Sequence, residues 1–204
     1  MLRLCTAICF LALGPLASGQ TTLFPASSSS SDQPITAQQR ADWFAVSTFG
    51  PASLAGGVIS AGLGTLFNRP SAYATHWDGF GKRYGMRLTG VSVSNAMEAS
   101  IGAIWGEDPR YVRSQSDSFG SRVGHVVKMT FVAQDRHGRL MPAYARYIAI
   151  SGNNFLSNAW RADSEATVGN ASLRTMLGFL GRMSGNAYQE FWPDVRHSLS
   201  RQQQ

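Results

Sequence analysis

The chain between Trp43 and Asn68 contains no Asp, Glu, Lys or Arg, and its small residues recur at every fourth position. This recurrence places them on one side of a helix, where small side chains let another helix approach closely. The pattern is typical of helices in a membrane or in a tightly packed core, and the sequence leaves both open. We predict that the helix-packing face consists of Ser53, Gly56, Gly57, Ser60, Ala61 and Gly64.

Apolar spacing, together with glycine and proline at the breaks, predicts helices along the rest of the chain. They cover residues 36–49, 51–67, 77–105, 119–134, about 142–160 and 166–191. The dipeptides Asp108-Pro109 and Trp192-Pro193 are expected to end the third and the last of them. Val, Ile and Thr are too scattered to predict strands of any length. The sequence therefore predicts an all-α fold, a compact bundle of five or six helices with glycine and other small residues on its packing faces.

The first 19 residues have the pattern of a secretory signal peptide. An apolar run at residues 4–16 follows Arg3 and precedes small residues up to Gly19, and the run is shorter than the roughly 20 residues of a membrane span. Cys5 and Cys9 both lie in this segment. The mature chain is therefore expected to lack thiols, which excludes disulfides, cysteine catalysis and Cys-ligated metals.

The remaining sequence divides into three segments by composition. Residues 20–35 are rich in Ser and Pro and predict a disordered tether, and residues 199–204 predict a disordered tail. Residues 36–198 are long enough for a single helical domain with its own core. We expect an exported protein of the periplasm or cell envelope, associated with a membrane or soluble.

The net charge of the whole chain is +6, and nearly all of the basic residues are arginines. Arginine binds phosphate and carboxylate groups through two hydrogen bonds, so a membrane or an anionic envelope component is the expected partner. Codon usage in a GC-rich genome is the alternative explanation for the predominance of arginine among the basic residues. The basic residues form no cluster, and nucleic acid is not an expected partner.

The five tryptophans lie near predicted helix ends, as interfacial aromatic residues do in membrane proteins. Tryptophans that close the core of a soluble bundle would give the same pattern. The predicted interfacial aromatics are Trp43, Trp77, Trp105, Trp160 and Trp192.

Glu98 is the one charged residue between Arg87 and Glu107, and its helix should turn it inward. A lone arginine, Arg146, is the expected partner in a buried ion pair. The alternative is an acid with a perturbed pKa in a polar cavity. With His125, these residues define the candidate polar pocket of Glu98, Arg146, His125 and Arg87.

No histidine pair has metal-ligand spacing, and common hydrolase, P-loop, dinucleotide and zinc-protease motifs are absent from the sequence. We therefore expect no metal site, no cofactor and no catalytic signature. Glu107 and Asp108, before Pro109, predict a turn in which Asp or Glu pairs with a nearby arginine; the alternative is a pair of carboxylates that share acid and base work.

Six short segments of the sequence resemble segments of a known protein family. They are Ser47–Pro51, Gly79–Arg83, Glu107–Tyr111, Arg122–His125, Ser157–Trp160 and Glu190–Asp194. Their order over most of the mature chain resembles an uncharacterised family of exported, glycine- and arginine-rich helical proteins found mostly in acidobacterial genomes. The resemblance implies export and assigns no activity, ligand or catalytic residue.

These patterns favour a non-enzymatic cell-envelope protein, a membrane-associated helical bundle with a structural or interaction role. Attachment is expected through a hairpin within Trp43–Asn68 and through the aromatic residues at helix ends. The alternative is a soluble periplasmic hydrolase or small-ligand binder that uses Glu98, Arg146 and His125. A soluble scaffold domain is a third hypothesis.

Overall fold

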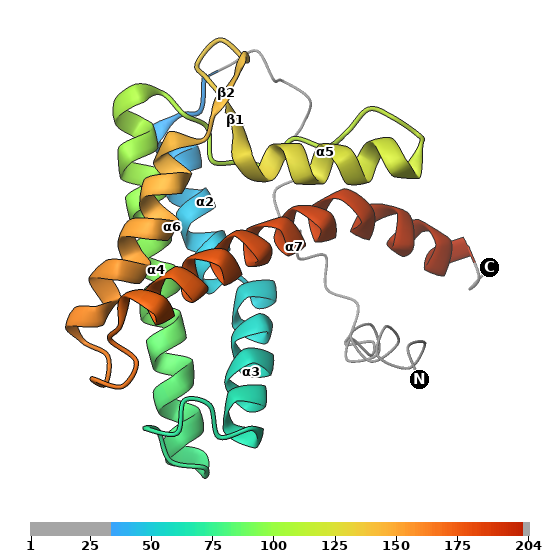
Figure 1. Cartoon of the computed structure of the whole chain (residues 1–204). Coiled ribbons are helices and arrows are strands. Elements are labelled where there is room, and N and C mark those ends of the chain that lie inside the picture. Colours follow the sequence, from blue (N-terminus) through green and yellow to red (C-terminus); the bar gives the residue numbers. More distant parts are fainter. Residues whose placement is uncertain (1–33, 202–204) are drawn as a thin grey trace.

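The computed structural model describes residues 34–201 of the 204-residue chain, and Figure 1 shows their arrangement. The elements in chain order are α2 (Ala37–Phe49), α3 (Pro51–Leu66), α4 (Trp77–Trp105), α5 (Phe119–Phe131), β1 (Val132–Gln134), β2 (Leu140–Pro142), α6 (Tyr144–Leu156), the 3₁₀ helix η1 (Ser157–Ala159) and α7 (Val168–Arg201). The all-α prediction is confirmed. The predicted signal peptide and most of the predicted tether lie outside the described residues.

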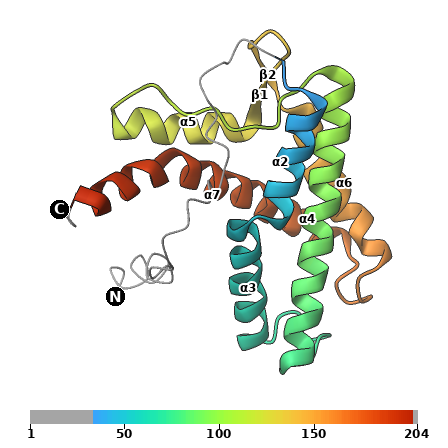
Figure 2. The same ribbon diagram turned by 180° about the vertical axis from the view of Figure 1, so that it is seen from behind.

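Helix α4 is the centre of the fold, and α2 and α3 follow one another along one side of it (Figure 2). The Thr36 hydroxyl and the Gln39 side chain cap the start of α2, and Pro51 opens α3. The chain does not reverse at Gly50, so the hairpin expected within Trp43–Asn68 is wrong. Helix α3 pairs instead with the first half of α4, which runs in the opposite direction.

One arginine holds the loop at the end of this α3–α4 hairpin. The Arg83 guanidinium donates to the carbonyl oxygens of Arg69, Pro70, Tyr73 and Ala74 at 2.7–3.0 Å. The loop backbone lies so close to α4 that a Cβ atom on Gly79 would overlap the loop (1.6 Å from the Ala74 oxygen). Glycine at position 79 therefore permits the contact that Arg83 completes.

The fourth predicted helix is shorter than expected because its last residues form a strand. Helix α5 ends at Phe131, and β1 pairs in antiparallel register with β2. The Asp135 side chain accepts hydrogen bonds from the backbone N–H groups of His137 and Arg139, and Gly138 adopts a left-handed φ of 72°. This tight turn makes the short hairpin possible, although its strands are only three residues long.

The predicted helix end at Trp192-Pro193 is also wrong, since α7 continues to Arg201. Proline removes one backbone donor from a helix. The missing donor is the one that would bond to the Gln189 carbonyl, while the carbonyl of the neighbouring Glu190 accepts hydrogen bonds from Arg122 and Arg113, at 2.7 and 2.9 Å. The predicted boundary of the domain at residue 198 therefore lies inside α7.

The second half of α7 and α5 pack together and project sideways from the other helices (Figure 1). A small apolar cluster joins them, and its buried members are Tyr111, Val126 and Met129. Elsewhere the buried apolar residues are mainly alanines. The largest fully buried side chains are instead mostly polar: Arg146, Glu107, Glu190, Thr48, Thr130, Pro109 and Ser157.

Candidate functional site

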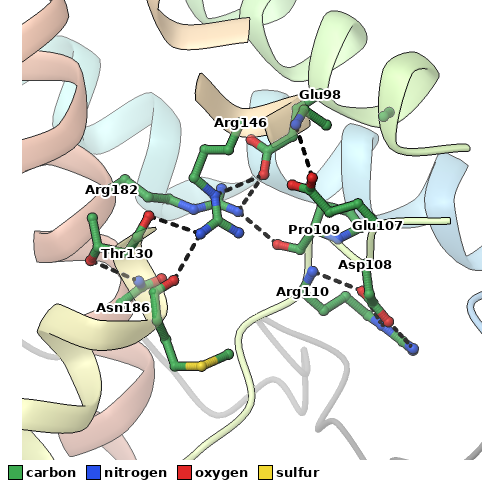
Figure 3. Close-up of polar contacts among 12 residues, drawn as sticks. Glu98, Glu107, Asp108, Pro109, Arg110, Thr130, Arg146, Arg182 and Asn186 are labelled. Carbon is green, nitrogen blue, oxygen red and sulfur yellow. Dashed lines mark hydrogen bonds and ion pairs between the residues drawn. The ribbon is translucent and has the colours of Figure 1, made fainter. Parts of the chain in front are cut away.

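A buried ion network lies where α4, α6 and α7 meet (Figure 3). Glu98 Oε1 accepts from Arg146 Nε at 3.0 Å and from Arg182 Nη2 at 2.8 Å. The Glu98 and Arg146 side chains are only 3% and 2% exposed. The ion pair expected between these two residues is confirmed, and Arg182 is a third member.

The two arginines also bind backbone from other segments. Arg146 Nη1 donates to the carbonyl oxygens of Met129 and Thr130 at the end of α5, at 2.8 and 3.0 Å. Arg182 Nη2 donates to the carbonyl of Pro109 at 2.6 Å. Burial, reinforced by the nearby Arg146 charge, lowers the pKa of Arg182 to about 10. Arg182 therefore stays charged at neutral pH and joins α7 to the segment after α4.

The geometry around Glu98 is that of an ion-pair network. Its Oε1 atom accepts charge-assisted hydrogen bonds from two guanidinium groups. Removing one partner from a buried ion network costs about 3–5 kcal/mol, so such a network holds elements in place. The geometry supports the structural interpretation of Glu98.

Glu107 lies beside this network at the start of α6. Its Oε2 accepts from the backbone N–H of Ala145 at 2.8 Å, while its buried Oε1 has no hydrogen-bond partner among the described residues. Burial raises the pKa of Glu107, and the Ala145 N–H partly opposes the shift. The predicted turn that follows is also present, with Asp108 and Arg110 in contact at 2.7 Å.

A second polar cluster surrounds Glu190 in α7. Glu190 Oε1 accepts from Arg122 Nε at 2.7 Å. Glu190 Oε2 accepts from the Tyr111 hydroxyl at 2.9 Å and from the Ser114 N–H at 3.0 Å. Arg122 also pairs with Asp194 at 2.6 Å. Three of the segments quoted from the sequence, 107–111, 122–125 and 190–194, therefore meet in one place.

The charge of Glu190 is well stabilised there. Burial disfavours the carboxylate, but the donors from Arg122, Ser114 and Tyr111 outweigh burial and lower the pKa of Glu190. Burial and the Glu190 hydrogen bond raise the pKa of Tyr111 well above its usual range. All of these groups have partners within the cluster, which makes it a clamp between α5 and α7.

The structure does not bring the four residues of the predicted polar pocket together. His125 Nε2 donates to the carbonyl of Val112 at 2.8 Å, and its ring lies edge-on to Tyr111. Arg87 Nη1 donates to the carbonyl of Ser53 in α3 at 3.1 Å. Only Glu98 and Arg146 are in contact. A hydrolytic or binding pocket built from Glu98, Arg146 and His125 therefore has no geometric support.

The predicted packing face lies partly against α4. Gly57 and Ala61 are buried, and a Cβ atom on Gly57 would lie 2.8 Å from a ring carbon of Tyr84. Gly64 and Gly56 lie under the side chains of Arg83 and Arg87, and the Ser53 carbonyl binds Arg87. Ser60 is exposed and lies outside the contact. The small residues therefore make room for long side chains of α4.

The five tryptophans divide into two groups. Trp77 and Trp105 are exposed at the two ends of α4, and Trp160 is exposed after η1. Trp43 lies inside α2, where Arg182 approaches its ring at 5.5 Å, and Trp192 stacks on Tyr188 inside α7. Three of the five therefore occupy exposed positions at helix ends.

Large apolar side chains are exposed on several helices. On α7 they recur at helical spacing as Leu173, Met176, Leu177 and Leu180, and on α5 as Phe119, Val123, Val127 and Phe131. On α3 and just after it they are Val58, Ile59, Leu63, Leu66 and Phe67. One stretch of the described chain, Ala37–Leu66, is long and apolar enough to cross a membrane, and 17% of its most apolar window is buried.

Sequence reasoning missed Arg182 and Glu190 as centres of the two polar clusters. Both residues carried a usable signal. Arg182 is the one charge between Arg174 and Glu190, as isolated as Glu98 is in α4, and Glu190 belongs to a segment already singled out. The sequence does not reveal which distant helix receives each charge.

The part of the chain that the structure describes contains no group of three or more His, Cys, Asp or Glu residues able to hold a metal ion. The chain was also compared with known proteins. No family model, curated protein or solved structure matches it.

Proposed function

We propose that this protein is a non-enzymatic, membrane-associated protein of the cell envelope with a structural or interaction role. The observation that carries the proposal is the distribution of side chains, with charged residues buried and large apolar residues exposed on α3, α5 and α7. Soluble monomers rarely expose extended apolar patches, and such patches mark membrane or partner surfaces. The proposed export of the protein is based on the signal-peptide pattern of residues 1–19.

Helix α3 is the proposed attachment element. Five large apolar residues, Val58 to Phe67, are each at least half exposed, and none of residues 43–68 is charged. Burying one such side chain in an apolar medium is worth about 1.5–3 kcal/mol. Together these residues supply enough apolar surface for stable attachment.

The length of α3 favours attachment from one side of the membrane. Its 16 residues span about 24 Å, less than the hydrocarbon thickness of about 30 Å. An amphipathic helix lies in the membrane plane with its apolar face about 5–10 Å deep. Arg69, Trp77 and Lys82 are exposed near the end of the hairpin, where headgroups would meet them.

The first test is fractionation of the mature protein, with washes of the membranes in high salt and then in alkaline carbonate. We expect retention through the salt wash, because the proposed contact is apolar. Purified protein should also sediment with liposomes that contain anionic lipid. Recovery in the soluble fraction throughout would contradict the proposal.

Substitutions on α3 locate the contact. Leu63→Glu and Leu66→Glu should each weaken liposome binding at least tenfold, since a charge in the apolar layer costs more than 1.4 kcal/mol. Leu140→Glu is the matched control, because Leu140 is equally exposed but lies on β2 at the other end of the molecule (Figure 1). Circular dichroism checks the fold of each variant. Equal losses in all three variants would remove α3 as the attachment element.

A further inference from the structure

A cleft of about 850 Å³ lies between the start of α2 and the second half of α4. Its volume is within the range of small-molecule sites, about 300–1,000 Å³. Half of its lining residues are alanines or a phenylalanine: Ala37, Ala41, Phe44, Ala96, Ala99 and Ala103. Two arginines, Arg40 and Arg136, also line it.

Neither arginine has a carboxylate partner within the described part of the chain. Arg40, which is 9% exposed, donates only to the carbonyl oxygens of Ala99 (3.4 Å) and Glu107 (3.0 Å). Arg136 donates to the carbonyls of Ala103 and Ile104 at 3.2 and 3.3 Å. Asp108 and Glu107 are the nearby acids that attract Arg40 without an ion pair; Asp108 is held by Arg110, and Glu107 accepts from the Ala145 N–H. A guanidinium has five N–H donors, and Arg40 uses two of them in these bonds.

Two glycines make room for these side chains. A Cβ atom on Gly102 would lie 2.9 Å from Arg40 Nη1, and one on Gly106 would lie 2.4 Å from Arg136 Nε. Gly106 also has a left-handed φ of 82°, which other residues rarely adopt. The end of α4 thus accommodates two cations at one apolar cleft.

We infer that this cleft binds a single-chain anionic amphiphile. Its carboxylate or phosphate monoester would pair with Arg40 and Arg136, because guanidinium groups bind both anions through paired hydrogen bonds. Its chain would lie along Phe44 and the alanines. The inference is independent of the attachment through α3, since the two sites share no residue.

The test is photolabelling of the full mature protein in a nonionic detergent. The probes are a diazirine-bearing fatty acid and the fatty alcohol of the same chain, which partitions similarly but has no charge. We expect the acid to label cleft residues such as Phe44 and Ala99, and the alcohol to label them much less. Equal labelling by the two probes, or acid labelling confined to α3 and α7, would overturn the inference.

Two arginines of the β-hairpin turn provide a matched pair of variants. Arg136→Gln should weaken labelling of the cleft about tenfold, the effect of losing about 1.4 kcal/mol from a charge-assisted contact. Arg139→Gln should leave labelling unchanged, because Arg139 is exposed and pairs with Asp135. If both variants label like the wild type, the arginines only cap the carbonyls of α4 and the inference fails.

Two further experiments block the part of the cleft that would hold the hydrocarbon chain of the amphiphile and vary its headgroup. Ala96→Leu should reduce labelling without changing a residue that binds either arginine, because Ala96 lines the cleft and is exposed. Competition by unlabelled fatty acid or by a single-chain lipid phosphate identifies the preferred headgroup. Competition by inorganic phosphate as strong as by either lipid would show a simple anion site and contradict the inference. Liposome binding by Leu63→Glu is scored separately, so either proposal can fail alone.

Discussion

At the scale of single residues, two buried glutamates respond to their surroundings in opposite directions. Hydrogen-bond donors lower the pKa of Glu190, whereas burial raises that of Glu107. Ionised Glu190 therefore contributes stability at neutral pH. The burial that raises the pKa of Glu107 costs stability as the pH rises above the unfolded pKa, and acid relieves that cost. The pH dependence of folding combines these opposite contributions.

The effect of Glu190 can be isolated with Glu190→Gln. The contribution of the carboxylate is present above its unfolded pKa of about 4.3 and is lost as the pH falls through its lower folded value. We expect Glu190→Gln to destabilise the protein by about 3–5 kcal/mol at pH 7 and by progressively less as the pH falls below about 4. Urea unfolding at several pH values measures the difference.

Asp117→Asn is the control for this experiment, because Asp117 is an exposed carboxylate outside the cluster. It should change stability by less than about 0.5 kcal/mol at any pH. A pH-independent cost for Glu190→Gln would mean that the cluster depends on shape and not on charge. Glu107 is present in every variant, so its opposite contribution cancels.

Residue-scale prediction succeeded where a charge was isolated within its helix. Glu98 and Arg146 were expected to pair because a buried charge requires a counter-charge, and the structure has them 3.0 Å apart. Arg87 was grouped with them because it was expected on the same side of its helix as Glu98, and His125 was grouped by residue type. Both satisfy their hydrogen bonds on backbone carbonyls, and no sequence pattern specifies such partners.

At the scale of elements, the glycines of α3 differ in what surrounds them. Gly57 lies against Tyr84 and Arg87, whereas Gly62 has nothing within 4 Å of the position of a Cβ atom. The two glycines are five positions apart in the same helix, so they share the same backbone propensity. Any difference between substitutions at the two sites reports the contact with α4.

Gly57→Leu should destabilise the protein by about 1–3 kcal/mol, because overpacking forces α3 away from α4. Gly62→Leu should be neutral or stabilising, since leucine has a higher helix propensity than glycine. Thermal unfolding followed by circular dichroism measures both. Similar midpoints for the two variants would show that α3 does not depend on close packing.

The ends of helices were predicted best where a nearby glycine or proline in the sequence determines them. Helix α4 begins at Trp77 and ends at Trp105, as predicted, and the left-handed Gly106 caps it ahead of the Asp108-Pro109 pair that was expected to end it. Helix α7 passes through Pro193, although proline is a local stop signal. Arg122 and Arg113 bind the Glu190 carbonyl nearby, so contacts with distant segments accompany the continuation of the helix.

At the scale of the whole molecule, the polar centres and the apolar surface belong to one arrangement. The Glu98 and Glu190 clusters fasten the helices to one another from inside. The apolar residues of α3, α5 and α7 are therefore left at the surface. Such a molecule keeps its fold without burying these residues, and a membrane or partner is free to cover them.

This arrangement predicts that lipid stabilises the folded state. Anionic liposomes at about 100 times the dissociation constant should add about 2.7 kcal/mol, because lipid binds the folded protein in preference to the unfolded chain. Scanning calorimetry should record a higher unfolding midpoint. Leu63→Glu should show a much smaller shift, and a full shift for that variant would place the lipid contact elsewhere.

The loop at the end of the α3–α4 hairpin has a practical consequence. Arg83 binds main-chain carbonyls of this loop and none of the side chains of Ser71, Ala72 or Thr75, which are exposed. Arg83 also contacts the side chains of Asn68 and Tyr73, so the exposed side chains of Ser71, Ala72 and Thr75 are the ones free to be exchanged. A cysteine introduced at Ser71 would carry a spin label or fluorophore to this end of the molecule, and the label would report how near to the bilayer the hairpin lies.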